Sequence, residues 1–271
     1  MARLSLAVLQ KEIATLKAQR VDPPAPMSRL EMAATLGLTL DEWQRSALTS
    51  EATQSLWNAH RQSGKSTIAA ILGLHTALST PNALVLAVSP GERQSKLLFR
   101  TMMTFYRHLG RPVPALVENR LSVELANGSS IFALPGDADT VRGFSGVNLV
   151  LADEAARIPD PMMAAVRPML SVSGGRLVTM STPAGKVGWF WAAWDQGGDD
   201  WERVRVPATA CPRISPAWLE QERRALPASW FAAEYECEFG DVDDAAFRGE
   251  DIAAAFSPEV RPLFIPEELS A

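Results

Sequence analysis

The stretch RQSGKST, residues 61–67, decides the fold of this 271-residue chain. It lies between residues 55–58, a short strand candidate, and residues 65–78, which have the composition of a helix. A glycine, a lysine and a hydroxyl residue in this order, at a strand-to-helix junction, are typical of a phosphate-binding loop, in which the hydroxyl binds Mg²⁺. The usual pattern G-x-x-x-x-G-K-S/T is broken, because Ala59 stands at the first glycine. By itself the motif therefore fits a surface loop equally well.

Around this loop, strands and helices alternate. Residues 83–89, 149–152 and 177–181 form continuous apolar runs, as expected of strands buried on both faces. Helical segments are expected at 65–78 and 91–109, and a hairpin with a type I′ turn at Asn127-Gly128 is expected within 120–134. The alternation predicts an α/β fold whose mainly parallel sheet has helices on both sides. The active site is then expected at the carboxyl ends of the strands.

Two acids stand at that end of the 149–152 strand. Asp153 is expected to hold Mg²⁺, and Glu154 is expected to orient and deprotonate an attacking water. The alternative is a strand that simply ends in solvated acids. The separation from Lys65 is natural for one nucleotide-binding core, which favours the first interpretation.

Other candidate site residues gain weight only together with the phosphate-binding loop. Ser181-Thr182-Pro183 follows the next buried strand and is expected beside the γ-phosphate, although such a tripeptide is also common in turns. Gln44 carries a donor and an acceptor that fit an adenine edge. Arg142 could neutralise transition-state charge within its own subunit or on a neighbour, and Arg61 competes for that role. The alternative for both arginines is an ordinary salt bridge.

Composition narrows the function classes. The formal net charge of −5 and the pI of about 5.4 argue against a free-standing DNA binder, so DNA contact requires a local patch or charged partners. The segment 91–109, with Arg93, Lys96, Arg100 and Arg107, is one candidate, and a merely solvated helix face is the alternative. Two cysteines and three scattered histidines predict neither a disulfide framework nor a metal cluster. No apolar run is long enough for a membrane span, and the N-terminus does not resemble a signal peptide.

The chain divides into four expected parts. Residues 1–26 are expected to be a helical arm with a proline-rich linker, 27–207 the core, 208–245 a small lid of two helices, and 246–271 a linker and tail. A helix packed on its own domain is an equal alternative to the arm. Residues 234–251 contain eight acids. They suggest either a nuclease metal site or a solvated acidic linker, and the linker is favoured because acid runs are usually solvated.

Taken together, five motifs in this order resemble those of the large terminase subunits of tailed bacteriophages, the DNA-packaging motors. Residues 43–44 resemble the adenine motif, and residues 61–66 resemble the deviant Walker A motif that often lacks its first glycine. Arg142 matches the arginine-finger position, and residues 149–154 match the Walker B motif with its catalytic glutamate. Ser181-Thr182-Pro183 is similar to the coupling motif. The resemblance covers about residues 30–245.

This resemblance implies an additional-strand P-loop NTPase with a helical lid subdomain, which hydrolyses ATP with Mg²⁺. The implied catalytic residues are Glu154, Lys65, Arg142 and Arg61. The implied nucleotide contacts are Gln44, Gln62, Ser63, Gly64, Lys65, Ser66 and Thr67. The implied metal ligands are Ser66 and Asp153, and the implied coupling residues are Ser181, Thr182 and Pro183.

The implied partners are double-stranded DNA, the portal protein and the small terminase subunit. The chain is expected to be a monomer in isolation and a ring when transiently docked on the procapsid in the host cytoplasm. Too few residues follow residue 245 for the nuclease domain of these proteins, so no DNA cleavage is expected from this chain. Two other functions stay open: a helicase-like ATPase that remodels nucleic acid, and a non-hydrolysing nucleotide-binding scaffold. A small-molecule kinase leaves Trp43-Gln44 and Ser181–Pro183 unexplained.

Overall fold

The computed structural model describes residues 27–135 and 143–241 and the single residue Ala255. The predicted arm 1–26, the arginine-finger candidate Arg142 and almost all of the tail 246–271 lie outside the described residues. The division at residues 207 and 245 therefore stays a prediction.

An eight-stranded sheet forms the centre of the molecule, in the order β3-β4-β5-β2-β6-β7-β1-β8. The strands are β1 (Gln54–Ala59), β2 (Leu84–Ser89), β3 (Ala115–Glu118), β4 (Ser122–Leu125), β5 (Ser130–Pro135), β6 (Leu149–Asp153), β7 (Arg176–Ser181) and β8 (Glu202–Val206). From β5 to β8 all neighbours pair in parallel, whereas β3–β4 and β4–β5 pair antiparallel. Strand β7 lies between β1, which precedes residues 61–67, and β6, which carries Asp153. The predicted additional-strand, mainly parallel sheet is confirmed.

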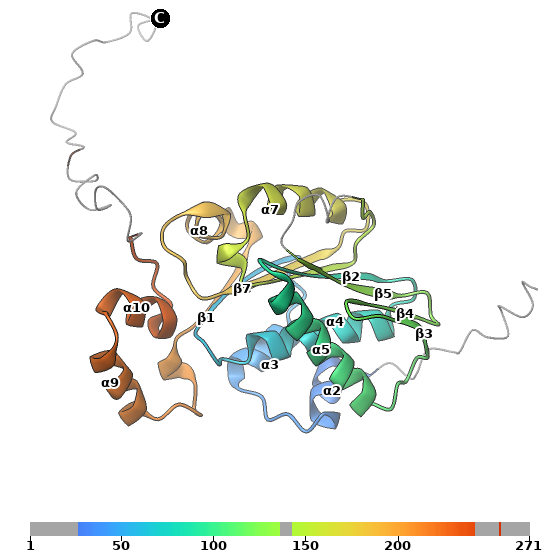
Figure 1. The fold of residues 1–271 in the computed structure, drawn as a ribbon, viewed down its shortest axis with the longest axis horizontal. Helices are drawn as coiled ribbons and strands as arrows, with labels where there is room; N and C mark the ends of the chain where they lie inside the picture. Colours follow the sequence, from blue (N-terminus) through green and yellow to red (C-terminus); the bar gives the residue numbers. More distant parts are fainter. Residues whose placement is uncertain (1–26, 136–142, 242–254, 256–271) are drawn as a thin grey trace, which may run out of the picture.

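Helices cover both faces of this sheet (Figure 1). The helices are α2 (Arg29–Thr35), α3 (Glu42–Thr49), α4 (Lys65–Ser79), α5 (Glu92–His108), α7 (Asp160–Val166), α8 (Gly188–Gln196), α9 (Pro216–Ala225) and α10 (Ala228–Glu236). A hydrophobic core lies on each face of the sheet, and successive residues of β1 point into different cores. Trp57 packs with α4 and α5, and Leu56 packs with α7 and α8. Strands buried on both faces explain the continuous apolar runs in the sequence.

The predicted hairpin between β4 and β5 exists, but the predicted type I′ turn is wrong. A type I′ turn needs positive φ at both central residues. Gly128 has φ 83°, whereas Asn127 does not adopt a positive φ. The N–H of Gly128 donates to the carbonyl of Leu125, and the N–H of Leu125 donates to Ser129, the pattern of a type I turn followed by a glycine bulge. The longer loop lets the Asn127 amide donate to the Ala77 carbonyl in α4, which tethers the hairpin to that helix.

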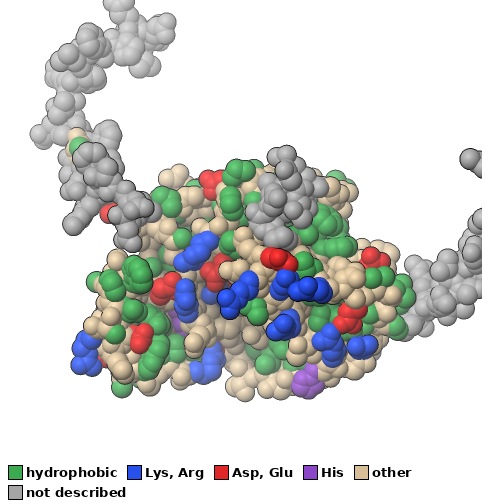
Figure 2. Space-filling view, in the orientation of Figure 1, with side chains coloured by type: hydrophobic (Ala, Val, Ile, Leu, Met, Phe, Trp, Pro, Cys, Tyr) green, Lys and Arg blue, Asp and Glu red, His purple; other side chains and the backbone are tan. Residues whose placement is uncertain are grey.

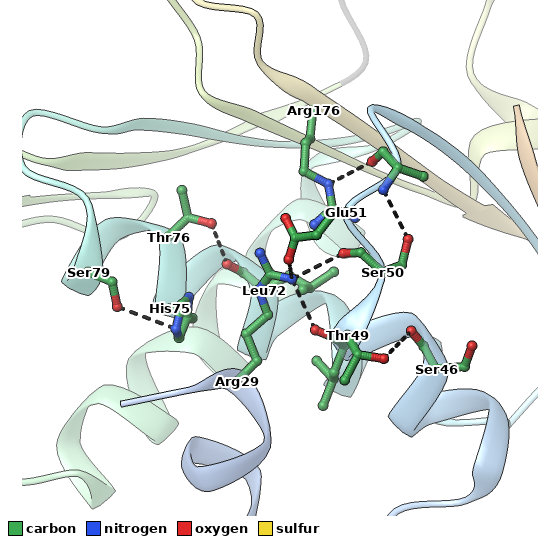
Figure 3. A network of polar contacts seen from close by, with 12 residues as sticks. Arg29, Ser46, Thr49, Ser50, Glu51, Leu72, His75, Thr76, Ser79 and Arg176 are labelled. Atoms are coloured by element: carbon green, nitrogen blue, oxygen red, sulfur yellow. Dashed lines mark hydrogen bonds and ion pairs between the residues drawn. The ribbon is translucent and has the colours of Figure 1, made fainter. Parts of the chain in front are cut away.

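A polar network anchors the helices that precede β1 (Figure 3). The Arg29 guanidinium of α2 donates to the carbonyls of Leu48 and Ser50 and pairs with the Glu51 carboxylate. From β7, Arg176 donates through Nε to the Ala52 carbonyl. These bonds fix the chain between α3 and β1, and so fix α3, which carries Gln44, relative to the sheet.

Helices α9 and α10 lie beside β1 at one side of the sheet (Figure 1), so the two helices predicted within residues 208–245 exist, and their role as a lid stays a prediction. The segment that they form begins where β8 ends at Val206, whose carbonyl accepts the N–H of His60. After α10 the chain returns to the sheet: Cys237 is buried, and its carbonyl accepts the Asn58 side-chain amide. Phe239 then packs on aromatic rings of α8, with 4.8 Å between its ring centroid and that of Trp191. The lid segment is therefore fastened to the core at both ends.

The described acids of the run 234–251 are ion-paired. Their partners are Arg61 for Glu234, Arg223 for Glu236, Arg205 for Glu238 and Lys186 for Asp241. This differs from the purely solvated linker that the sequence predicted. Within the described part of the chain, no three acids, histidines or cysteines cluster in a way that could hold a metal ion. None of the described helices is long and apolar enough to cross a membrane.

Candidate active site

The loop that follows β1 has the geometry of an anion site. Gly64 adopts φ 89°, a conformation that favours glycine, and a Cβ there would lie 2.6 Å from the Gln44 amide nitrogen, so the Gln44 side chain would have to shift. Helix α4 begins directly afterwards, and Gly64 offers no side chain to cap its first N–H groups. These groups and the positive end of the helix dipole are available to an anion. Within the loop Gln62 is exposed and Ser63 is buried, and Thr67 is half-buried in the first turn of α4.

The loop meets the two acids at the end of β6, as the sheet rule predicts. The Lys65 ammonium lies 3.8 Å from Glu154 Oε1. The Ser66 hydroxyl donates to Asp153 Oδ2 at 3.0 Å. Lys65 and Asp153 are each only 7% exposed, so these charges face one another away from bulk water. Residues far apart in the sequence thus form one polar centre.

Asp153 is a suitable magnesium ligand. Burial raises the pKa of its carboxyl, and the nearby Lys65 ammonium opposes that rise. Its Oδ1 also accepts the N–H of Glu154 at 3.0 Å. A buried carboxylate beside a hydroxyl gives two hard oxygen donors, which is the chemistry that Mg²⁺ prefers. A cation held between Ser66 and Asp153 would stabilise the charged carboxylate that burial disfavours.

Glu154 is held in place by its backbone and by two cations. Its φ of 52° and ψ of 41° are left-handed, a conformation that is uncommon outside glycine and that clusters at functional sites. The 3₁₀ turn η1 (Ala155–Arg157) follows, and it brings Arg157 back to the glutamate: Arg157 Nη1 donates to Glu154 Oε2 at 3.1 Å. The same nitrogen donates to Thr182 Oγ1 at 3.3 Å. Arg157 was not predicted, because its three-residue spacing from Glu154 has no meaning until the turn between them is known.

Arg61 pairs with an acid of helix α10. Its Nε donates to Glu234 Oε2 in α10 at 2.6 Å, and its backbone N–H donates to the Glu234 carbonyl. The Glu234 carboxylate raises the pKa of this guanidinium. In this structure Arg61 is therefore the salt-bridge partner that the sequence allowed as its alternative role. A catalytic role for Arg61 stays a prediction.

Gln44 lies against the loop, and both ends of its amide are occupied. Its Oε1 accepts the N–H of Asp41, and its Nε2 donates to the Ser63 carbonyl at 2.8 Å. Arg213 supports the same region, since it pairs with Asp41 at 2.7 Å. The amide supports the phosphate loop in this structure, and its predicted contact with adenine stays a prediction.

The coupling candidates lie at the end of β7, next to the acids. Thr182 accepts the bond from Arg157, and Pro183 lines a cavity of about 570 Å³ between this segment and α10. The Ser181 hydroxyl is buried and, among the described residues, has no hydrogen-bond partner. The same holds for Ser89, at the end of β2 on the other side of β6. Buried hydroxyls normally find a partner, so these two are unusual, and they lie on the strands that flank the one carrying Asp153.

Comparison with known proteins agrees with this geometry. The family model described as terminase large subunit, T4likevirus-type, N-terminal, matches residues 57–254. The large terminase subunit of Escherichia phage T5 is 29% identical over 195 residues, which are 69% of this chain and 44% of that protein. The large terminase subunit of Thermus phage G20c is 24% identical over 233 residues, which are 71% of this chain and 47% of that protein. The chain thus spans less than half the length of these relatives.

Solved structures share the fold. The large terminase ATPase domain of Thermus phage P74-26 aligns with a TM-score of 0.69 at 22% identity, over 81% of this chain and all of that one. A large terminase from a thermophilic bacteriophage, in complex with ATP-γ-S, aligns with a TM-score of 0.61 at 13% identity, over 74% of this chain and 53% of that one. The match of the family model to most of the chain places the polar centre in a known context: the chain belongs to the T4likevirus-type family of terminase large subunits and corresponds to its N-terminal part.

Proposed function

We propose that this chain is the ATP-hydrolysing motor domain of a phage large terminase, which translocates double-stranded DNA into the procapsid. The observation that carries the proposal is the meeting of Lys65, Ser66, Asp153 and Glu154 at the carboxyl ends of β1 and β6. The complex of a related large terminase with ATP-γ-S supports a nucleotide as the ligand.

Each residue has a defined task in this proposal. The triphosphate lies on residues 61–67, where Lys65 exchanges its contact with Glu154 for the β- and γ-phosphates. Ser66 and Asp153 hold Mg²⁺, which neutralises charge on the phosphates when bound. Glu154, released from Lys65, takes the proton of the attacking water. Arginine charge, from Arg61 or from Arg142 of the same or a neighbouring subunit, stabilises the transition state. Ser181, Thr182 and Pro183 transmit phosphate release to the lid.

DNA contact is assigned to the basic face of α5. Arg93, Arg100 and Arg107 are exposed on this helix, and Figure 2 shows Lys and Arg side chains gathered over this side of the molecule. With a net charge of −5, such a local patch is what allows contact with a polyanion. Membership of the terminase family supports the portal protein and the small terminase subunit as partners, in a ring that docks on the procapsid in the host cytoplasm.

Hydrolysis is tested by comparing Glu154→Gln with the wild-type chain and with Glu124→Gln, the same change at an exposed position on β4. Glu154→Gln is expected to bind ATP within about threefold of wild type and to lose about 10²–10⁴-fold in turnover, the typical contribution of a general base. Glu124→Gln is expected to behave as wild type. Full turnover in Glu154→Gln, with ATP bound, would favour a non-hydrolysing scaffold whose apparent activity comes from a contaminant.

Packaging is tested with portal-bearing procapsids and linear duplex DNA. ATP turnover is expected to rise only when both are present, and DNA is expected to become protected from nuclease inside the procapsid. Turnover that responds equally to any nucleic acid, together with strand separation of a forked duplex, would instead support the helicase-like function.

A further inference from the structure

A chain of alternating charges links the phosphate loop to the lid and back. Lys65 lies 3.8 Å from Glu154, and Glu154 accepts from Arg157 at 3.1 Å. Arg157 lies 3.6 Å from Glu234 in α10, and Glu234 pairs with Arg61 at 2.6 Å. The chain begins and ends on the loop 61–67 and passes through the acid that is proposed as the general base. Any change in charge at the loop therefore reaches the lid through neighbouring contacts.

Arg157 occupies the middle of this chain. Its Nη1 contacts Glu154 and Thr182, whereas its Nη2 faces Glu234. The planar guanidinium carries its donors on separate nitrogens and so reaches acceptors on two sides, whereas the three donors of a lysine ammonium radiate from one nitrogen. The side chain is 40% exposed and lines the 570 Å³ cavity beside α10, so its contacts are not locked by packing.

Arg157 is one of two cations that contact Glu154. Both oxygens of Glu154 face cations in this structure, Oε1 facing Lys65 and Oε2 accepting from Arg157. The proposed function moves Lys65 to the phosphates, and Arg157 then remains as the cation that orients the glutamate. Since the other side of Arg157 faces Glu234, the orientation of Glu154 and the position of α10 are linked.

We propose that Arg157 is a positioning residue that holds Glu154 towards the attacking water and ties this orientation to the lid helix α10. The inference rests on the proposed ATPase function and adds to it a residue and a connection. Arg157 is not assigned a contact with the nucleotide, so its loss should affect turnover and leave binding largely unchanged.

The experiment measures kcat, KM and nucleotide affinity of the full chain for Arg157→Ala, Arg157→Lys, Glu234→Gln and the double variant Arg157→Ala/Glu234→Gln. Arg157→Ala is expected to lower kcat about 10- to 100-fold, the effect of a small misplacement of a reacting group, with KM within about threefold of wild type. Arg157→Lys restores one contact and should give an intermediate kcat. Glu234→Gln should have a smaller effect on kcat. Glu234 reaches Glu154 through Arg157, so the double variant should be no slower than Arg157→Ala, and the separate contact of Glu234 with Arg61 should not add to the loss.

Arg205→Ala is the matched control. Arg205 also pairs a core strand with the lid region, at 3.3 Å from Glu238, but it does not contact Glu154. Its kcat is expected to stay within about twofold of wild type. Equal losses in Arg157→Ala and Arg205→Ala would overturn the inference, and so would single effects that multiply in the double variant or a loss confined to KM.

The proposed function fails in a different way. It fails if Glu154→Gln retains wild-type turnover, whatever the result at Arg157. If Glu154→Gln is inactive while Arg157→Ala and Arg157→Lys keep wild-type kcat, the ATPase function stands and the role of Arg157 is refuted. The lysine variant, which keeps the charge and most of the side-chain volume, allows this comparison even if the alanine variant does not fold.

Discussion

The sheet core and the lid are built by different physical means. Helix α4 buries ten of its fifteen residues between the sheet and its neighbouring helices. In the lid, α9 buries none of its ten residues, and α10 buries only Phe231. Ion pairs fasten α10 and the residues behind it, such as Glu234 with Arg61 and Arg205 with Glu238, together with the aromatic packing of Phe239 on α8.

This difference assigns separate tasks to the two regions. Close packing fixes the distance between the loop 61–67 and the acids on β6, because a packed core resists small displacements. Exposed ion pairs contribute about 0–1 kcal/mol each, and they exchange partners at little cost. In the proposed function, the region that keeps its geometry is the packed one, and the region proposed to move is held in part by ion pairs that can be replaced.

The largest expected effect concerns matched leucines in the two regions. Leu72→Ala in α4 removes a side chain that is 1% exposed and should lower the free energy of unfolding by about 2–5 kcal/mol. Leu219→Ala in α9, where the leucine is only half-buried, should cost less than about 1 kcal/mol. Urea unfolding followed by circular dichroism measures both. Similar losses would show that the lid is packed as firmly as the core.

A second prediction concerns a buried polar contact of the core. Gln44→Ala removes the acceptor for the Asp41 N–H and the donor to the Ser63 carbonyl. If each bond is worth about 1 kcal/mol, the affinity for ATP and for GTP should fall alike, by about 5- to 30-fold, because the loop loses its support. Fluorescent analogues of the two nucleotides measure this. A loss confined to ATP would instead support direct contact of Gln44 with adenine.

A third prediction concerns Asp153, whose buried carboxylate lowers the free energy of unfolding when it is charged. Burial raises the pKa of this carboxyl in the folded state, so folding is penalised as pH rises from the ordinary aspartate pKa through the raised value. Asp153→Asn should therefore raise the melting temperature at pH 7 without nucleotide, by about 2–4 °C for each kcal/mol relieved. The gain should shrink as the pH falls towards 4, and thermal melts across pH measure it. Turnover should be lost, and a lower melting temperature at pH 7 would contradict the argument.

The smallest expected effect is that of salt on the lid. Raising the ionic strength from about 0.1 M to 1 M shortens the Debye length from about 10 Å to about 3 Å, and it weakens exposed ion pairs such as Arg157 with Glu234. Amide hydrogen exchange in α10 should accelerate about two- to fivefold, whereas exchange in α4 should stay unchanged. Equal acceleration in both helices would mean that the lid does not depend on its ion pairs.

Much of the fold could be predicted because it rests on local patterns. Apolar runs bounded by polar residues located β2, β6 and β7, and the Gly-Lys-Ser sequence located the start of α4. The edge strands β3 and β8 were not predicted, because β3 is only four residues long and mostly exposed, and β8 alternates apolar with charged residues. The hairpin turn was misassigned because Asn127 is committed to α4, a tertiary contact that the dipeptide does not reveal.

Some residues of the candidate site could likewise be predicted from the sequence, and others could not. Lys65, Ser66, Asp153 and Glu154 follow strands or open a helix, so the sheet rule was sufficient to bring them together. The roles of Arg157, Arg61 and Gln44 depend on the left-handed turn at Glu154, on the placement of α10 and on the loop backbone. These are contacts between distant segments, and residue type and spacing do not specify them.

The double attachment of the lid has a mechanical consequence. The lid segment is joined to the sheet at both ends, through Val206 and through Phe239 in the α8 aromatic cluster. A segment held at both ends has less freedom to move than an arm attached at one end. The lid segment can tilt when its ion pairs change, but it cannot move far from the sheet unless Phe239 leaves the α8 aromatic cluster. Work done at the phosphate loop would then leave the domain as a short, stiff stroke, suited to pushing against a large opposing force.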